Sequence, residues 1–152
     1  MMHRHRRRIA IPILILSAAV LAPVAALAGP PVPPGTIVGT PDADVLHGTP
    51  GPDLIFAFAG PDKIYGGWGA DRIFAGPGDD GVRGGPGPDT IRGGLGEDRI
   101  ASGQGNDLVL VAGDGSIDHV WCGDGRMDLA IVDPDDVIAN DCEFVWARDP
   151  ES

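Results

Sequence analysis

The chain has 152 residues, enough for one domain and a short appendage. Its 24 glycines and 15 prolines make up about a quarter of the sequence, and aromatic residues only 5%, which excludes a large globular core. The formal net charge of −11 argues against nucleic acid as a partner, because phosphate binding requires positive charge. A glycine and proline content this high indicates disorder unless these residues recur with a fixed period.

Residues 1–28 have the organisation of an export signal. Four arginines between residues 4 and 8 precede an apolar stretch at 9–27, and Ala-Leu-Ala at 26–28 supplies a small-residue cleavage pattern. Two prolines interrupt the apolar stretch, which favours removal of the segment over its retention as a membrane anchor, although the sequence leaves both possibilities open. We therefore expect bacterial-type export and a secreted, extracellular chain with no membrane span. Removal would leave 7 basic and 22 acidic residues, a net charge of −15 that calls for neutralising cations.

A proline-rich spacer and then a strict repeat follow the export signal. Residues 29–38 begin with GPPVPP, which is typical of a stiff spacer. Residues 39–110 divide without insertion into eight units of nine: GTPDADVLH, GTPGPDLIF, AFAGPDKIY, GGWGADRIF, AGPGDDGVR, GGPGPDTIR, GGLGEDRIA and SGQGNDLVL. The sixth residue of every unit is aspartate: Asp44, Asp53, Asp62, Asp71, Asp80, Asp89, Asp98 and Asp107. The eighth residue is always aliphatic, and the fourth is glycine in seven of the eight units.

This period predicts an all-β solenoid. Six residues of each unit are suited to turns, and three form a short strand whose middle, aliphatic residue points inward while its neighbours point outward. Two units then make one coil of 18 residues. Stacked coils would pair unit n with unit n+2 at about 4.8 Å, giving parallel strands on two faces.

The same stacking predicts two columns of carboxylates. Odd-numbered units contribute one column and even-numbered units the other, so that equal charges repeat at about the strand spacing. A hard divalent cation would relieve this repulsion and would also take oxygen from the carbonyls of the glycine-rich turns. Ca²⁺ suits such a site better than Mg²⁺, because Ca²⁺ accepts six to eight oxygen ligands in flexible geometry.

The units resemble the RTX (haemolysin-type) calcium-binding nonapeptide, G-G-x-G-x-D-x-U-x. GGWGADRIF, GGPGPDTIR and GGLGEDRIA match it at every defined position. The resemblance implies a parallel β-roll in which the eight aspartates and the turn carbonyls bind Ca²⁺ between units n and n+2. The glycines that it implies at these sites are Gly67, Gly69, Gly76, Gly78, Gly85, Gly87, Gly94, Gly96, Gly103 and Gly105.

The first three units depart from the RTX pattern. Thr40 and Thr49 occupy the second position of units 1 and 2, and Ala57-Phe58 replaces two glycines in unit 3. We therefore expect calcium sites between units 4 and 8 more firmly than in units 1–3. A metal-free glycine–proline solenoid is the alternative for the whole array.

Residues 111–152 lose the period and read as a C-terminal β cap. Strand-like runs at 117–122, 129–132 and 141–146 carry large apolar side chains, which suit the covering of an open solenoid end. The two cysteines, Cys122 and Cys142, predict one disulfide in an exported chain, with two free thiols as the alternative. A separate binding domain is the rival interpretation of this segment. The acidic run at 133–136 reads as a solvated turn, because it does not match an EF-hand loop.

The sequence indicates a binding protein rather than an enzyme. It contains no HExxH, Walker or GxSxG motif, and Asp118 beside His119 lacks a nucleophile context. We expect a secreted calcium-binding β-roll that is largely disordered without Ca²⁺ and folds on binding it. The alternative is a non-catalytic accessory or adhesion module of an extracellular hydrolase-like or surface-binding system, with an unidentified cell-surface partner.

Overall fold

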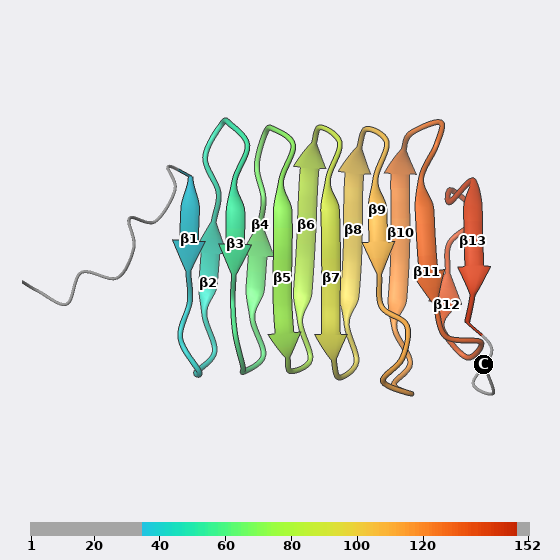
Figure 1. Ribbon diagram of the computed structural model, residues 1–152, viewed down its shortest axis with the longest axis horizontal. Helices are drawn as coiled ribbons and strands as arrows, with labels where there is room; N and C mark the ends of the chain where they lie inside the picture. The colour runs from blue at the N-terminus through green and yellow to red at the C-terminus, as the bar shows by residue number, and fades with distance from the viewer. Residues whose placement is uncertain (1–34, 149–152) are drawn as a thin grey trace, which may run out of the picture. The chain divides into compact units, whose positions relative to one another are not determined.

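The computed structural model describes residues 35–148. The predicted signal peptide, most of the predicted spacer and residues 149–152 lie outside the described residues. Within residues 35–148 the chain forms strands and no helix, so no helix there is long and apolar enough to cross a membrane (Figure 1). The strands are β1 (Thr36–Val38), β2 (Val45–His47), β3 (Leu54–Phe56), β4 (Lys63–Tyr65), β5 (Arg72–Pro77), β6 (Gly81–Pro86), β7 (Thr90–Leu95), β8 (Arg99–Gln104), β9 (Leu108–Leu110), β10 (His119–Asp124), β11 (Leu129–Val132), β12 (Val137–Ile138) and β13 (Phe144–Ala147).

The strands form two parallel sheets that alternate along the chain. One has seven strands in the order β1-β3-β5-β7-β9-β11-β13, and the other has six in the order β12-β10-β8-β6-β4-β2. We call them the odd sheet and the even sheet. In Figure 1 the odd strands run downward and the even strands upward, so each coil contributes one strand to each sheet. The predicted parallel β-solenoid is confirmed, and it has about six turns.

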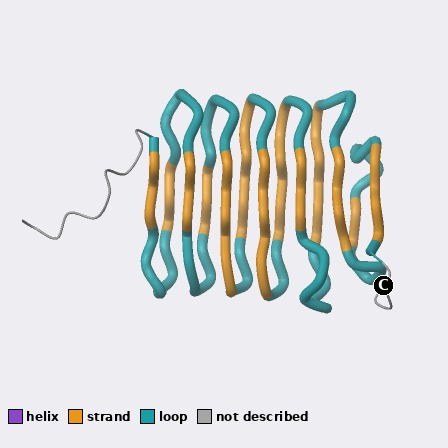
Figure 2. The backbone as a smooth tube through the Cα atoms, in the orientation of Figure 1, coloured by secondary structure: helices purple, strands orange, loops and turns teal. Residues whose placement is uncertain are grey.

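The register follows the nine-residue period. Ile55 pairs with Ile73 and Ile73 with Ile91, each step being one coil of 18 residues. The turns between strands lie along the two long edges of the sheets (Figure 2). Strands β5 to β8 have six residues rather than the expected three, because pairing continues from the seventh position of one unit to the third position of the next.

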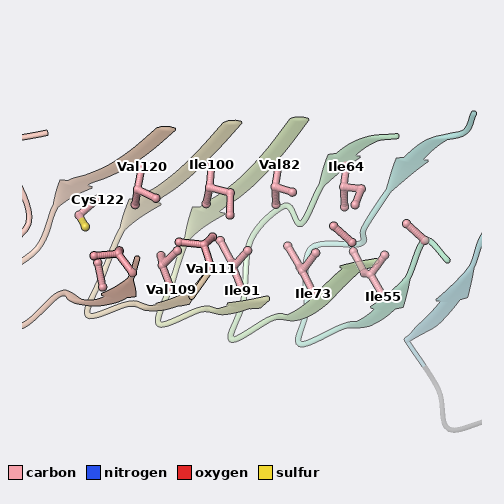
Figure 3. Close-up of a cluster of buried hydrophobic side chains, with 14 residues drawn as sticks. Ile55, Ile64, Ile73, Val82, Ile91, Ile100, Val109, Val111, Val120 and Cys122 are labelled. Atoms are coloured by element: carbon pink, nitrogen blue, oxygen red, sulfur yellow. The ribbon is translucent and has the colours of Figure 1, made fainter. Parts of the chain in front are cut away.

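The core consists of two facing rows of small and aliphatic side chains (Figure 3). The eighth position of the repeats supplies its larger members, among them Ile73, Ile91 and Ile100, all with 0% of their surface exposed. Every second residue of a strand points inward, so the first position is buried in units 3 to 8 and half-buried in units 1 and 2, and it is always glycine, alanine or serine. The interior is therefore thin, and three positions per unit face it: the aspartate, the aliphatic residue and the small residue.

Close stacking of the coils explains the glycine at the fourth position. Gly87 has a φ of 136°, and a Cβ added there would lie 1.7 Å from the carbonyl oxygen of Gly69 in the preceding coil. No side chain fits such a gap, and a positive φ of this size is unfavourable for any residue other than glycine. The turn glycines are thus required by the approach of one backbone to the next.

Both ends of the solenoid extend beyond the eight predicted units. Thr36–Val38, expected in the spacer, form β1, because Ile37 takes the place of an eighth-position residue and pairs with Ile55. At the other end β10 to β13 continue both sheets instead of building a separate layer. The division of the chain at residue 110 stays a prediction. The predicted disulfide is confirmed: Cys122 and Cys142 are bonded, with their Cα atoms 5.0 Å apart.

Phe58 is the one place where the structure accepts a costly backbone conformation. It stands at the second position of unit 3 with a φ of 77°, the only positive φ of a non-glycine residue between 35 and 148.

We expect Phe58→Gly to be more stable than Phe58→Ala by about 1 kcal/mol, since both variants remove the ring and only glycine relieves the left-handed backbone. Urea unfolding of the two variants in millimolar Ca²⁺ measures this difference. An alanine variant at least as stable as the glycine variant would show that Phe58 is not strained.

Candidate metal centre

The sixth-position aspartates stand directly before the strands, with their side chains turned into the solenoid. In the six from Asp62 to Asp107, the first carboxylate oxygen, Oδ1, accepts a hydrogen bond from the backbone N–H of the aspartate one coil earlier. The Asp71 N–H donates to Asp89 at 2.9 Å, and the Asp80 N–H donates to Asp98 at 2.9 Å. Six such bonds join aspartates 18 residues apart, from Asp44–Asp62 to Asp89–Asp107. The carboxylates thus form two columns, and each link ties one coil to the next.

The second carboxylate oxygen has no such partner. Oδ2 is buried and accepts no hydrogen bond from the described residues in eight aspartates: Asp62, Asp71, Asp80, Asp89, Asp98, Asp107, Asp118 and Asp128. Nor does a basic side chain compensate them, because the one ion pair among residues 35–148 joins Arg99 to Glu97 on the surface. A buried charge without a partner is strongly unfavourable. The arrangement therefore requires either protons or cations.

Burial changes the acidity of these carboxyl groups. Removal from water raises the pKa of Asp80 to about 6, of Asp89 and Asp118 to about 7, and of Asp98 to about 8. The backbone hydrogen bond from the preceding coil lowers these pKa values, and the neighbouring aspartates of the column raise them again, by less than burial does. The same causes raise the pKa of Asp62 and Asp71. Near neutral pH the columns thus resist full ionisation unless positive charge is supplied.

Backbone carbonyls lie close to the unpartnered oxygens. A Cβ added to Gly84 would lie 2.4 Å from Oδ2 of Asp89 and 2.4 Å from the carbonyl oxygen of Ser102, one coil further on. At Gly66 the equivalent distances are 2.7 Å to Oδ2 of Asp71 and 2.5 Å to the carbonyl oxygen of Gly84. At Gly66 and Gly84, one carboxylate oxygen and one carbonyl oxygen therefore converge on the same small space. This set of hard oxygen donors fits Ca²⁺.

No group of three or more His, Cys, Asp or Glu side chains that could hold a metal occurs among residues 35–148. A cation in these columns would accordingly take most of its ligands from the backbone. That excludes a site of the zinc type, which uses three or four side chains, and again favours Ca²⁺.

The ten predicted glycines lie in the turns or in the last residues of strands β5 to β8, with φ between 104° and 149°. The carbonyl oxygens of Gly67 and Gly69 point along the solenoid toward Gly85 and Gly87, where an added Cβ would lie 2.0 Å and 1.7 Å from them. The turns thus present columns of carbonyls beside the columns of carboxylates. That these glycines and the eight aspartates are the calcium ligands stays a prediction.

The first two units satisfy their aspartates in another way. Oδ2 of Asp44 accepts hydrogen bonds from the backbone N–H and the hydroxyl of Thr40, at 2.6 Å and 2.9 Å. Thr49 contacts Asp53 in the same way, at 2.6 Å from its N–H and 3.1 Å from its hydroxyl. Threonine at the second position therefore provides the partner that the later units lack, which gives a physical reason for expecting weaker calcium sites at the start of the array.

The sequence analysis missed three members of the columns. Oδ1 of Asp118 accepts from the Asp98 N–H at 2.8 Å, that of Asp128 from the Asp107 N–H at 2.8 Å, and that of Asp136 from the Asp118 N–H at 2.9 Å. The first two steps span 20 and 21 residues instead of 18, so the period conceals them. The signal that could have found them is an aspartate two residues before an inward-facing apolar residue, as in Asp118 and Val120. Asp136 is accordingly part of a column and not only of a solvated turn.

Comparison with known proteins agrees with this geometry. The sequence profile of the RTX calcium-binding nonapeptide repeat, which contains four copies of the unit, matches residues 38–73, 47–82 and 74–109. Residues 38–109 belong to the RTX repeat family. The family predicted from the sequence is confirmed, and with it a calcium-binding β-roll module, which is a structural fold and not a catalytic family. No curated protein matches the chain.

The raised pKa values predict an unusual pH dependence for the RTX solenoid without metal. Folded pKa values of about 6 to 8 for Asp80, Asp89, Asp98 and Asp118 exceed the unfolded value of about 3.9. The folded state therefore binds more protons, and its stability is greatest below about pH 4 and falls as the pH rises from there to about 8. The β-sheet signal in the circular dichroism of metal-stripped protein should therefore be greatest at acid pH and should decrease over this range.

Saturating Ca²⁺ provides the control, because the cation binds the ionised carboxylates and should remove or reverse this trend. A β-sheet signal of the metal-stripped protein that rises with pH would contradict the assignment of buried, uncompensated carboxyl groups.

Proposed function

We propose that this protein is a secreted calcium-binding β-roll that folds on binding Ca²⁺ and serves as a non-catalytic structural or interaction module outside the cell. The observation that carries the proposal is the set of eight buried carboxylate oxygens without a partner, arranged in two columns beside backbone carbonyls. Ca²⁺ is the cation that neutralises such a column and also accepts carbonyl oxygen.

The size of the core supports folding that depends on calcium. Burying one isoleucine or valine contributes about 1.5–3 kcal/mol, and each unit buries one such residue, as Ile91 does in unit 6. One buried polar group without a partner costs about 1–3 kcal/mol, and a charged one costs more. The unpartnered aspartate of a unit therefore offsets most or all of what its aliphatic residue contributes. Without cations or protons, little remains to balance the entropy of ordering the chain.

Two further features support an extracellular location. A disulfide joins Cys122 and Cys142, and disulfides persist in oxidising compartments. The sequence pattern of residues 1–28 predicts export. Outside the cell Ca²⁺ reaches the millimolar concentrations that fill weak sites, whose dissociation constants are about 10⁻⁴–10⁻³ M. As an accessory or adhesion module, the protein would use the outer faces of its sheets for contact, which leaves the columns free for Ca²⁺.

A calcium titration tests the proposal directly. Metal-stripped protein at neutral pH should have the circular dichroism of a largely disordered chain, and millimolar Ca²⁺ should convert it to a β-sheet spectrum. Calorimetry should show binding of several ions per chain over the same range, because binding and folding share one free energy. An unchanged spectrum together with no heat at millimolar Ca²⁺ would refute the proposed function.

Two matched substitutions test which aspartates hold the ion. Asp89→Asn removes a carboxylate whose Oδ2 has no partner, whereas Asp53→Asn removes one that Thr49 already satisfies. We expect Asp89→Asn to bind fewer Ca²⁺ ions, to need about tenfold more Ca²⁺ for half-maximal folding and to be more stable in chelator, because a neutral amide replaces a buried charge. Calorimetric stoichiometry and the circular dichroism midpoint measure these effects. If Asp53→Asn has the larger effect on calcium binding, the assignment of the ligands is wrong.

A further inference from the structure

The outer face of the even sheet contains a groove of about 350 Å³, lined by side chains of β4, β6, β8 and β10. Two outward rows of residues build it. The seventh positions place Gly81 between Lys63 and Arg99, and the ninth positions place Arg83 and Ala101 between Tyr65 and Trp121. Gly81 and Ala101 are the small residues of the two rows, and their long neighbours surround the space above them. We call this space the β6–β8 groove.

The β6–β8 groove is positively charged although the chain as a whole is acidic. Lys63, Arg83 and Arg99 line it, and no aspartate or glutamate does. Of the three, Arg99 makes an ion pair with Glu97, whereas Lys63 and Arg83 have no acidic partner within 4.0 Å among residues 35–148. Three cations gathered on a chain of net charge −11 are complementary to an anionic ligand.

Aromatic rings form the two ends of the β6–β8 groove. Tyr65 stacks on His47 with ring centroids 4.8 Å apart, and the guanidinium of Arg83 lies 5.9 Å from the tyrosine ring. At the other end Trp121 is 44% exposed. The residue paired with it in β8 is Ala101, whose side chain is too small to cover the indole on that side. Tyr65 and Trp121 stand three strands apart, about 14 Å at the usual strand spacing. The groove therefore offers an exposed indole at one end, a phenol ring flanked by His47 and Arg83 at the other, and positive charge between them.

We propose that the β6–β8 groove binds a carboxylated oligosaccharide, a short stretch of a uronic-acid polymer. The apolar face of a sugar ring packs against an exposed indole or phenol ring, and its carboxylate pairs with Arg83, Arg99 or Lys63. The separation of the rings suits a ligand several sugars long rather than a single small anion.

This proposal goes beyond calcium binding, since the groove uses outward-facing residues that take no part in the columns. Calcium contributes to this binding only indirectly, by stabilising the stacked coils that bring Lys63 and Trp121 to one surface.

Binding is tested on the full chain in saturating Ca²⁺, after circular dichroism has shown that the protein is folded. The probe is a short oligogalacturonate, and the corresponding neutral galactose oligosaccharide is the control. We expect calorimetric binding of the acidic probe that weakens with added salt, and little binding of the neutral one. Folding and ligand binding are measured separately. A failure of the calcium proposal would therefore appear in the circular dichroism spectrum, and a failure of the oligosaccharide proposal would appear in the calorimetric titration of the folded protein.

Matched variants locate the site. Arg83→Ser and Trp121→Ala should each weaken binding by about tenfold, the effect of losing one charge-assisted or stacking contact. Arg92→Ser and Trp146→Ala are the controls, because both residues occupy outward positions on the odd sheet, in β7 and β13, and should leave binding unchanged.

Four outcomes would overturn the proposal. The first is the absence of binding by folded protein, and the second is equal affinity for the acidic and the neutral probe. The third is tighter binding of a short single-stranded oligonucleotide than of the oligogalacturonate, with the oligonucleotide affinity reduced by Arg83→Ser. That result would assign the groove to nucleic acid. Equal losses in the variants of both sheets would likewise exclude the groove as the site.

Discussion

The hydrogen bond between one aspartate carboxylate and the backbone of the preceding coil is the constraint on which this solenoid depends. Each such bond uses Oδ1, as in Asp98, and leaves Oδ2 buried beside it. The contact that stacks the coils is thus also the contact that creates an uncompensated charge. A column of these groups forms a stable structure only when positive charge enters it, which links the fold directly to cation binding.

The same constraint separates the roles of the positions in each unit. The turns are limited to glycine by the approach of one backbone to the next, and the inward positions are limited by the narrow space between the sheets. Only the outward seventh and ninth positions are free to vary. On the odd sheet they include Phe56 and Phe74, stacked at 5.0 Å, whereas the even sheet carries the basic and aromatic side chains of the β6–β8 groove. Specific recognition by a solenoid of this kind therefore depends on these two rows of each sheet.

The parts of the fold that could be predicted are those with an uninterrupted period. Between Asp44 and Asp107 the spacing never changes, so the coil length, the inward residues and the two columns follow by counting. Beyond Leu110 the coils lengthen by two or three residues, and Asp118 and Asp128 no longer stand at the expected interval. Their roles depend on pairing with Asp98 and Asp107 in space. Similarly, Thr40 reads as a departure from the repeat in sequence, while in the structure it is the hydrogen-bond partner of Asp44.

The sequence by itself determined the repeat, the parallel solenoid, the cysteine pair and membership of a calcium-binding repeat family, because each of these follows from residue type at a fixed interval. The tertiary structure alone decided which carboxylate oxygens lack a partner, where the columns end and which side chains share a surface. Lys63 and Trp121 are far apart in the chain and share one sheet surface only because the two coils that contribute β6 and β8 stack between them. Contacts across coils depend on the length of every intervening turn, and that length is set by how the backbones pack.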